Sequence, residues 1–379
     1  MRHLGSIFLV FALALSSQSG FAEQTMDSED ALSMAEVTAV DRAQRGKFTE
    51  ALASEQNALK LAENRYGPTH PSLVPILADL ATLDRDLALY PQAESNLQWA
   101  LAIRQRNFGI DDLRTAESLG QLASLYFDWG HWEDAEFFQR KAVVLYKQAP
   151  ASAADPQRLA EAFGLWGQIE LEFGKKDDAL SLLKKCGEIL EKIPEVPASQ
   201  LIQSLNLLAS TYHALGKYPE EGSCLEKALQ TAQKGFKANA VELADAQQSL
   251  AGFYHSQGRE KEAQPLYDSA LKIYQGCVGS YFGYSSLPYV QKLAKARMAA
   301  KQWKEAEGLL QNILPSCREI YGTSHPQVAV FLLELAQAQE GLGQTGIARE
   351  NLKTALQMAR SFYRDDHPLV LQIQKELRR

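Results

Sequence analysis

Three short phrases of the chain place a histidine directly before a proline. They read YGPTHP from Tyr66, YGTSHP from Tyr321 and YRDDHP from Tyr363. An imidazole can bind a transition metal or act as a base, so His70, His325 and His367 are the first candidates for chemistry. A metal site needs ligands that converge, and the first two phrases begin 255 residues apart. We therefore expect no metal site here and interpret the phrases as boundaries between structural units.

Thiol chemistry is the second candidate, but no two cysteines form a CxxC motif. In an oxidising compartment the four cysteines could form two disulfides, and a bridge between Cys186 and Cys224 is conceivable. Small buried thiols are the interpretation that we favour. The four residues are Cys186, Cys224, Cys277 and Cys317.

The sequence contains no motif of a familiar enzyme class. A phosphate-binding loop, a GxSxG elbow and an HExxH helix are all missing, and no cysteine has a plausible histidine partner. We therefore predict a protein that is not an enzyme and has no cofactor.

The first residues have the pattern of a secretory signal peptide. Arg2 is followed by an apolar stretch from Ile7 to Leu15, and Gly20 and Ala22 have the small-residue spacing that signal peptidase recognises. The pattern predicts a signal peptide over residues 1–22, cleaved after Ala22, and a short linker over residues 23–29. We expect export, with the periplasm of a Gram-negative bacterium as the first choice and secretion as the alternative.

Composition excludes two classes of partner. The net charge of −7 repels phosphate backbones, so we expect no nucleic acid. No apolar run reaches the length of roughly 18 residues that a membrane span requires, so we expect no integral membrane span.

A turn signature recurs along the chain in steps of 42, 42, 44, 42, 42, 43 and 42 residues. It ends at Ala51, Ala93, Ala135, Ala179, Glu221, Ala263, Ala306 and Ala348. The position twelve residues before each of these ends is always Ala or Gly, for example Ala81, Ala123 and Ala209. The position seven residues after each end is a small residue in most repeats, for example Cys186. A fixed period of this size predicts a stacked array. Small residues at fixed positions let two helices approach closely.

Each unit is predicted to be a helical hairpin. Apolar residues recur at spacings of three and four on both sides of the turn, for example at Leu73, Ile76, Leu77 and Leu80. The three echoed phrases then separate hairpins. Gly67 and Gly322 end one helix in the first two phrases, and the prolines of all three begin the next helix. Thr69, Ser324 and Asp366 are the cap candidates.

The period, the small columns and the Gly-x-aromatic-x-Glu-Ala turn resemble the tetratricopeptide repeat in its 42-residue, kinesin light chain-like form. The resemblance covers residues 30–379, as about eight repeats and a C-terminal capping helix. It implies an all-α fold, a right-handed α-solenoid (superhelix) of stacked antiparallel helical hairpins. It also implies a concave groove that binds peptides or partner helices.

Family positions that point into the groove can be transferred to this sequence. They give a predicted peptide-binding groove of Arg85, Asp86, Phe127, Asp128, Gln168, Glu172, Asn206, His213, Gln248, His255 and Lys295. Its N-terminal half is acidic and its C-terminal half is neutral and polar. The Lys and Asn clamp of the chaperone-binding members is missing, so a basic or neutral peptide is the predicted ligand. A merely solvated acidic face is the alternative.

Two features remain open at this stage. His213 and His255 occupy the same inward position in adjacent repeats, where they could sense pH, bind a metal or simply form a polar lining. The stretch from Gly276 to Tyr289 breaks the repeat pattern, and its aromatic residues could anchor a partner or cover an apolar edge. We predict an exported scaffold that binds a protein or peptide. The alternative is a structural component of a cell-envelope complex, or self-association through the convex face or the ends.

Overall fold

The computed structural model describes residues 28–379 except 151, 152, 154 and 278–286. The predicted signal peptide and three aromatic residues of the 276–289 stretch, Tyr281, Phe282 and Tyr284, lie outside the described residues. The described chain forms seventeen α-helices. Their order is α1 (Ser28–Gln44), α2 (Phe48–Tyr66), α3 (Leu73–Asp86), α4 (Tyr90–Phe108), α5 (Leu113–Trp129), α6 (Trp132–Gln148), α7 (Pro156–Glu172), α8 (Lys176–Leu190), α9 (Ala198–Ala214), α10 (Tyr218–Gly235), α11 (Val241–Ser256), α12 (Glu260–Cys277), α13 (Leu287–Ala299), α14 (Trp303–Tyr321), α15 (Pro326–Gly341), α16 (Thr345–Arg360) and α17 (Pro368–Leu377).

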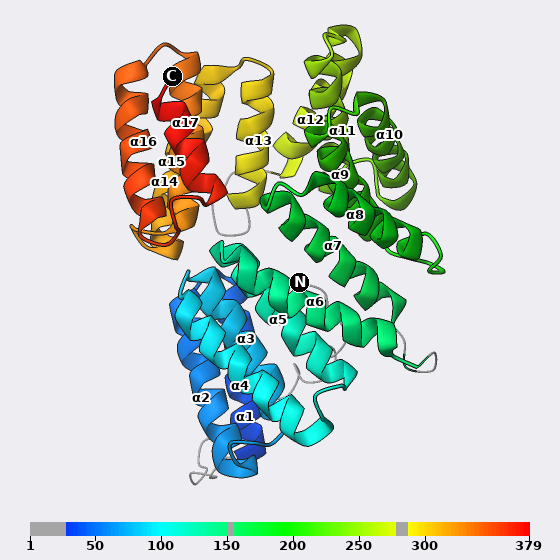
Figure 1. Ribbon diagram of the computed structural model, residues 1–379. Helices are drawn as coiled ribbons and strands as arrows, with labels where there is room; N and C mark the ends of the chain where they lie inside the picture. Colours follow the sequence, from blue (N-terminus) through cyan, green and yellow to red (C-terminus); the bar gives the residue numbers. More distant parts are fainter. Residues whose placement is uncertain (1–27, 151–152, 154, 278–286) are drawn as a thin grey trace, which may run out of the picture.

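The helices form eight antiparallel hairpins and a final single helix, stacked in chain order (Figure 1). This confirms the predicted all-α solenoid of helical hairpins. Its elements follow from the sequence pattern, because the turn signature lies between the two helices of each hairpin and the echoed phrases lie between hairpins.

The predicted small columns are buried between helices. Ala81, Ala123 and Ala209 expose at most 4% of their surface. At Gly167, which occupies the same column, an added Cβ would lie 2.6 Å from the Cγ atom of Leu183. Helix α7 therefore approaches α8 so closely that even alanine would push against a neighbouring side chain.

The echoed phrases separate helices, but the capping residues differ from the prediction. Helix α3 begins at Leu73 with Ser72 as its N-cap, so Pro71 does not lie in its first turn and Thr69 does not cap it. Gly67 and Gly322 follow α2 and α14 with φ of 85° and 91°, a conformation that favours glycine. The N-caps of α15 and α17 are His325 and His367, whose Nδ1 atoms accept backbone N–H groups of the first turn. The proposed caps Ser324 and Asp366 do not play this role. The imidazole nitrogen has the reach of a short polar side chain and takes their place.

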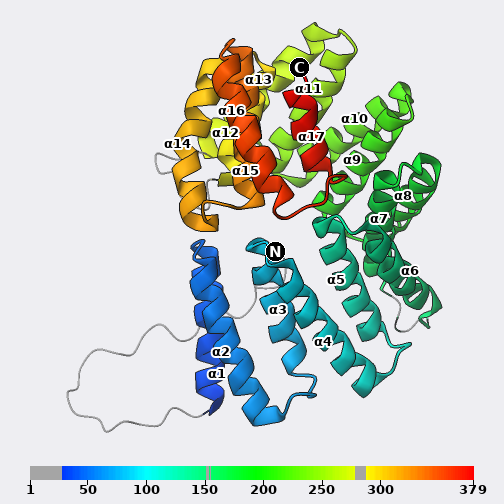
Figure 2. The same cartoon turned by 60° about the vertical axis from the view of Figure 1, so that its left-hand side comes forward.

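The array curves until its C-terminal part meets its N-terminal part. In Figures 1 and 2 the loops at one end of α14 to α17 face the loops at one end of α1 to α5. Direct contacts confirm this meeting: the hydroxyls of Tyr90 and Tyr363 are 2.9 Å apart, although 273 residues separate them. We call this contact between the two ends of the array the seam.

Placing a large side chain in one column of small residues tests whether the fold depends on close packing of its helices. The substitution Ala123→Leu places extra atoms in the fully buried gap between helices, so it is expected to cost about 1–3 kcal/mol of stability. Urea unfolding followed by circular dichroism measures this loss. Ala53→Leu, on the exposed face of α2, is the matched control and should change stability by less than about 0.5 kcal/mol. Equal effects at the two positions would contradict the packing described here.

Candidate functional site

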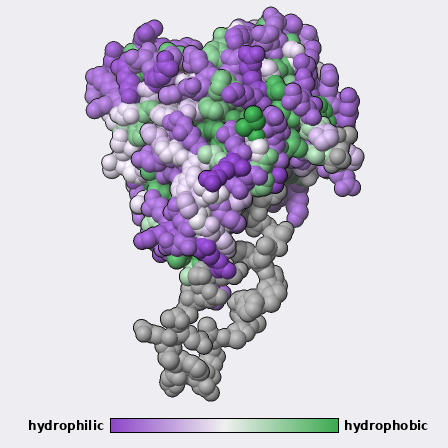
Figure 3. All heavy atoms as spheres, turned by 60° about the horizontal axis from the view of Figure 1, so that its bottom comes forward, coloured by the Kyte–Doolittle hydropathy of each residue, from purple (hydrophilic) through white to green (hydrophobic). Residues whose placement is uncertain are grey.

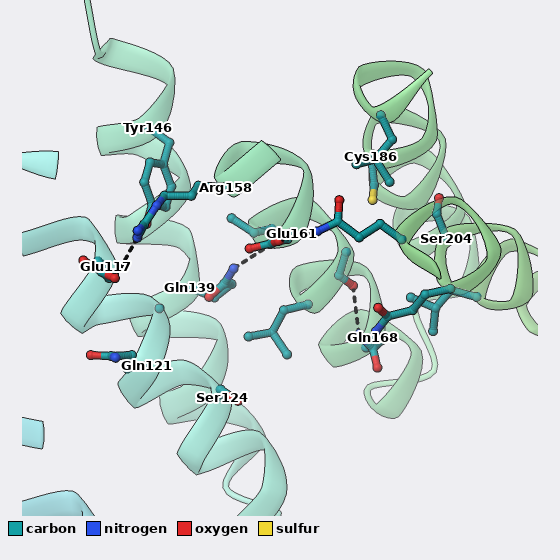
Figure 4. A pocket seen from close by; sticks show the side chains of 18 residues that line it. Glu117, Gln121, Ser124, Gln139, Tyr146, Arg158, Glu161, Gln168, Cys186 and Ser204 are labelled. Carbon is teal, nitrogen blue, oxygen red and sulfur yellow. Dashed lines mark hydrogen bonds and ion pairs between the residues drawn. The ribbon is translucent and has the colours of Figure 1, made fainter. Parts of the chain in front are cut away.

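A hollow of the concave surface lies between α5, α7 and α9, the first helices of three successive hairpins (Figure 4). It has a volume of about 730 Å³. Helices α6 and α8 contribute Gln139 and Cys186 to its floor. Gly120 helps to keep it open, because an added Cβ there would meet no atom within 4 Å. We call this hollow the concave cavity.

Amide and hydroxyl side chains dominate the polar lining of the concave cavity. Gln139 is 1% exposed and donates its Nε2–H to the Ala162 carbonyl at 2.7 Å, but its Oε1 has no partner in the protein. The same holds for Oε1 of Gln121 and Gln200 and for the hydroxyl of Ser204. A buried acceptor without a donor is unfavourable, so these atoms favour a ligand that brings N–H or O–H groups.

Charges in the concave cavity are largely compensated. Glu117 forms ion pairs with Arg158 at 2.8 Å and with Arg104 at 3.0 Å. The pKa of Arg158 is raised above its ordinary value, chiefly by its hydrogen bond to Glu117. Glu161 accepts hydrogen bonds from the amides of Gln157 and Gln200. Two arginines, on α4 and α7, thus compensate one of the two glutamates of this lining.

The seam is built from equivalent residues of successive repeats. The rings of Phe48 and Tyr321 stack at 5.7 Å between centroids. One repeat later the ring of Tyr90 contacts that of Tyr363 in a tilted arrangement at 6.1 Å. Both pairs are 273 residues apart. The third aromatic of the turn signature, Trp132, stacks at 6.0 Å on His367. Residues of the last two echoed phrases therefore contact the turns of the first three repeats.

Both histidines of the seam are held neutral. His325 accepts the Gln327 N–H at Nδ1, so its proton is on Nε2, which donates to the Asp86 carbonyl at 3.1 Å. Burial lowers the pKa of His325 to about 4. Burial also lowers the pKa of His367 to about 4. His367 leaves little room beside it, since a Cβ on Gly130 would lie 2.8 Å from its Cδ2 atom.

The predicted groove residues are divided among several places. Gln168 lines the concave cavity, while Arg85, Phe127, Asp128 and Glu172 line a second cavity of about 380 Å³ at the seam. Asp86 lies at the seam through its carbonyl group. Asn206 lines a third hollow of about 330 Å³ beside Asp245. Gln248 is half-buried on α11. Their role in binding a peptide stays a prediction.

The remaining predicted groove residues pair with carboxylates. His213 Nδ1 lies 3.0 Å from Glu221, and His255 Nδ1 lies 2.6 Å from Glu260, so each histidine faces the second helix of its own hairpin. Lys295 pairs with the buried Glu334 at 3.1 Å. The two histidines therefore do not converge on one site.

Sequence reasoning missed the cavity amides and the seam. Gln121 and Gln200 belong to no repeat-wide pattern. Gln139 did carry a signal, because it stands four residues after the turn signature, where most repeats have an apolar residue such as Leu97 or Leu183. A signal for the seam did exist. The 42-residue step from Phe48 to Tyr90 equals the step from Tyr321 to Tyr363, as two facing rows of aromatics require.

Other kinds of site were sought in the described part of the chain. It contains no group of three or more His, Cys, Asp or Glu side chains that could hold a metal. None of its helices has both the length and the apolar character to cross a membrane. All four cysteines are free; Cys186 and Cys317 are buried, as favoured above, while Cys224 and Cys277 are partly exposed.

Fold and site together define a helical-repeat protein with a hollow in its concave surface. The family model described as Tetratricopeptide repeat matches residues 30–106, 85–148, 200–276 and 286–361, more than half of the chain. The chain therefore belongs to the tetratricopeptide repeat family.

Two curated relatives share part of this repeat region. Nephrocystin-3 of Mus musculus is 38% identical over 106 residues, which are 27% of this chain and 8% of that protein. A clustered mitochondria protein homolog of Kluyveromyces lactis is 27% identical over 147 residues, 39% of this chain and 11% of that protein. The chain thus matches only a small part of each relative's length.

Solved structures show the same fold. The apo form of the quorum sensor NprR from B. thuringiensis has a TM-score of 0.57 at 14% identity, over 88% of this chain and 89% of that one. Kinesin light chain TPR-like repeats of Podosopora anserina have a TM-score of 0.47 at 21% identity, over 56% of this chain and 99% of that one. The predicted resemblance to the tetratricopeptide repeat is confirmed by the family model.

Protonation of the seam histidines should be measurable. The unfolded chain titrates its histidines near 6.5 and the folded chain titrates His325 near 4, so the unfolded chain binds more protons between these values. The contribution of His325 to stability is therefore complete above about pH 6.5 and is lost as the pH falls to about 4. Burial raises the pKa of Asp86 and of Asp128. These carboxyl groups therefore stabilise the folded chain at low pH, which opposes the effect of His325.

NMR titration of the imidazole signals measures the protonation of the histidines separately from that of the carboxylates. We predict midpoints near 4 for His325 and His367. The substitution His325→Gln should reduce the loss of stability on acidification, because it removes one of the groups that must take up a proton. A midpoint near 6.5 for His325 would show that its ring is not buried at the seam.

Proposed function

We propose that the chain is an exported, non-catalytic scaffold that binds a protein or peptide through its concave surface. The observation that carries this proposal is the concave cavity, with its unpaired amide and hydroxyl oxygens. An extended peptide offers a backbone N–H at nearly every residue, which is the donor that these acceptors lack. The compensated charges of the cavity favour an uncharged segment at this place.

A rigid receptor explains how such a surface binds with useful affinity. The cavity is lined by helices that small columns hold closely against their neighbours, and α7 is packed so closely on α8 that Gly167 has no room for a side chain. The ligand then loses conformational entropy on binding while the receptor loses little. The stacked hairpins fix the geometry in advance.

The second candidate is assembly with other copies or with an envelope complex. Phe137 and Val144 lie two turns apart on α6 and are 52% and 49% exposed, which favours a contact at that face. The face seen in Figure 3 is mostly hydrophilic, with small hydrophobic areas between charged ones. Light scattering of the purified protein separates the two candidates, since assembly requires an oligomer and the substitution Phe137→Ser should then weaken it.

Export rests on the N-terminal sequence alone. Expression in a Gram-negative host is expected to yield a mature chain that begins at Glu23 and lies in the periplasmic fraction. Mass spectrometry of the intact protein measures the cleavage. A chain that keeps residues 1–22 and stays in the cytoplasm would contradict this part of the proposal.

Peptide binding is tested by selecting ligands from a displayed library of random peptides and measuring their affinity by fluorescence anisotropy. The double substitution Gln121→Ala and Gln200→Ala removes two of the free acceptors, so it should weaken the selected peptides about tenfold, as the loss of one to two net hydrogen bonds would. Gln275→Ala, on an exposed part of α12, is the matched control and should leave affinity unchanged. Selected peptides that bind both variants equally well would show that the concave cavity is not the site.

A further inference from the structure

A second cavity lies at the seam and is separate from the concave cavity. Its volume is about 380 Å³, and its walls come from both ends of the array. The N-terminal half contributes Tyr90, Phe127 and Trp132. The C-terminal end contributes Tyr363 and His367. Aromatic side chains from two repeats and from the α16–α17 connection therefore meet around one space, which we call the seam cavity.

The seam cavity carries negative charge that the protein compensates only in part. Asp128 and Glu172 line it, and Asp86 lies close enough to Asp128 to raise its pKa further. One cation, Arg85, lines the same space, and its Nη1 atom is 3.4 Å from Asp128. His367 adds no positive charge at neutral pH because burial lowers its pKa to about 4. Two carboxylates and one guanidinium thus line the cavity, with the carboxylate of Asp86 nearby.

Backbone geometry strengthens this negative potential. Asp86 and Glu172 are the last residues of α3 and α7, and Asp128 is the last but one of α5. The C-terminal end of a helix carries partial negative charge, so a carboxylate there is unfavourable without a nearby cation. Burial raises the pKa of Asp86, Asp128 and Glu172, which shows that each anion is held at a cost.

We propose that the seam cavity binds the side chain of an arginine from the partner peptide and thereby tightens the contact between the two ends of the array. A guanidinium is planar and weakly hydrated, so it can pack on aromatic rings while it donates hydrogen bonds to carboxylates. The inference deepens the proposed function: it gives the peptide one basic anchor at the seam and an uncharged segment in the concave cavity.

Binding and closure are linked because the walls come from both ends. A ligand that contacts Asp128 and Tyr363 together has its full set of contacts only when the seam is closed. Such a ligand binds the closed form of the array more tightly than the open form, so its binding shifts the equilibrium toward the closed form. The seam is made of few direct contacts, such as the pair of hydroxyls of Tyr90 and Tyr363, so an added bridge is a substantial gain.

The test uses a probe too small to need the concave cavity. N-acetylarginine amide is titrated into the full mature chain, with N-acetylcitrulline amide as the uncharged probe of the same shape. NMR of the indole N–H of Trp132 reports binding, and hydrogen exchange over residues 363–371 reports closure. We expect the arginine probe to shift the indole signal and slow the exchange, and the citrulline probe to do neither.

Substitutions locate the binding. The pair Asp128→Asn and Glu172→Gln keeps the size of the side chains and removes two charges, so it should weaken the arginine probe about tenfold or more. Glu350→Gln, at an exposed position of α16, should leave it unchanged. Equal binding of the two probes, no binding of the arginine probe, or unaltered binding to the double variant would overturn the inference. None of these outcomes bears on library peptides that bind through Gln121 and Gln200, so the two proposals fail separately.

Discussion

Close approach of helices at small residues is the constraint on which the rest of the structure depends. Ala81, Ala123 and Ala209 are buried at the same position of their hairpins, and Gly167 has no room even for a methyl group. Because every hairpin repeats nearly the same contact, every hairpin is turned relative to its neighbour by a similar amount. These rotations add up along the chain. After six repeats they bring Tyr321 and Tyr363 onto Phe48 and Tyr90.

The seam turns an open array into one whose ends hold each other. Residues that separate hairpins elsewhere, the Tyr and His of the echoed phrases, are used a second time as contacts between the ends. His325 illustrates the double use, since one ring nitrogen caps α15 and the other donates to the Asp86 carbonyl. Closure of the seam also separates two parts of the surface that differ in chemistry. Uncompensated carboxylates gather at the seam, while the concave cavity between α5, α7 and α9 presents mainly neutral acceptors.

The sequence predicted what is periodic and missed what is not. Helical hairpins, buried columns and the closing helix follow from spacings that recur in every repeat. The N-caps were assigned to Ser324 and Asp366 because such residues usually cap helices, whereas the structure uses the histidines that follow them. The seam depends on small rotations summed over several repeats, which no local pattern encodes. Within the concave cavity, Arg104 and Arg158 reach Glu117 from other helices, and no local sequence pattern encodes this pairing.

Contact between the two ends in solution is the central claim, and one NMR measurement tests it most directly. In protein with labelled tyrosines, a nuclear Overhauser effect is expected between the rings of Tyr90 and Tyr363, whose centroids are 6.1 Å apart. The rings of Tyr126 and Phe138, 5.5 Å apart within one hairpin, provide the internal reference. A reference signal without the signal between Tyr90 and Tyr363 would show that the array is open and would contradict the account.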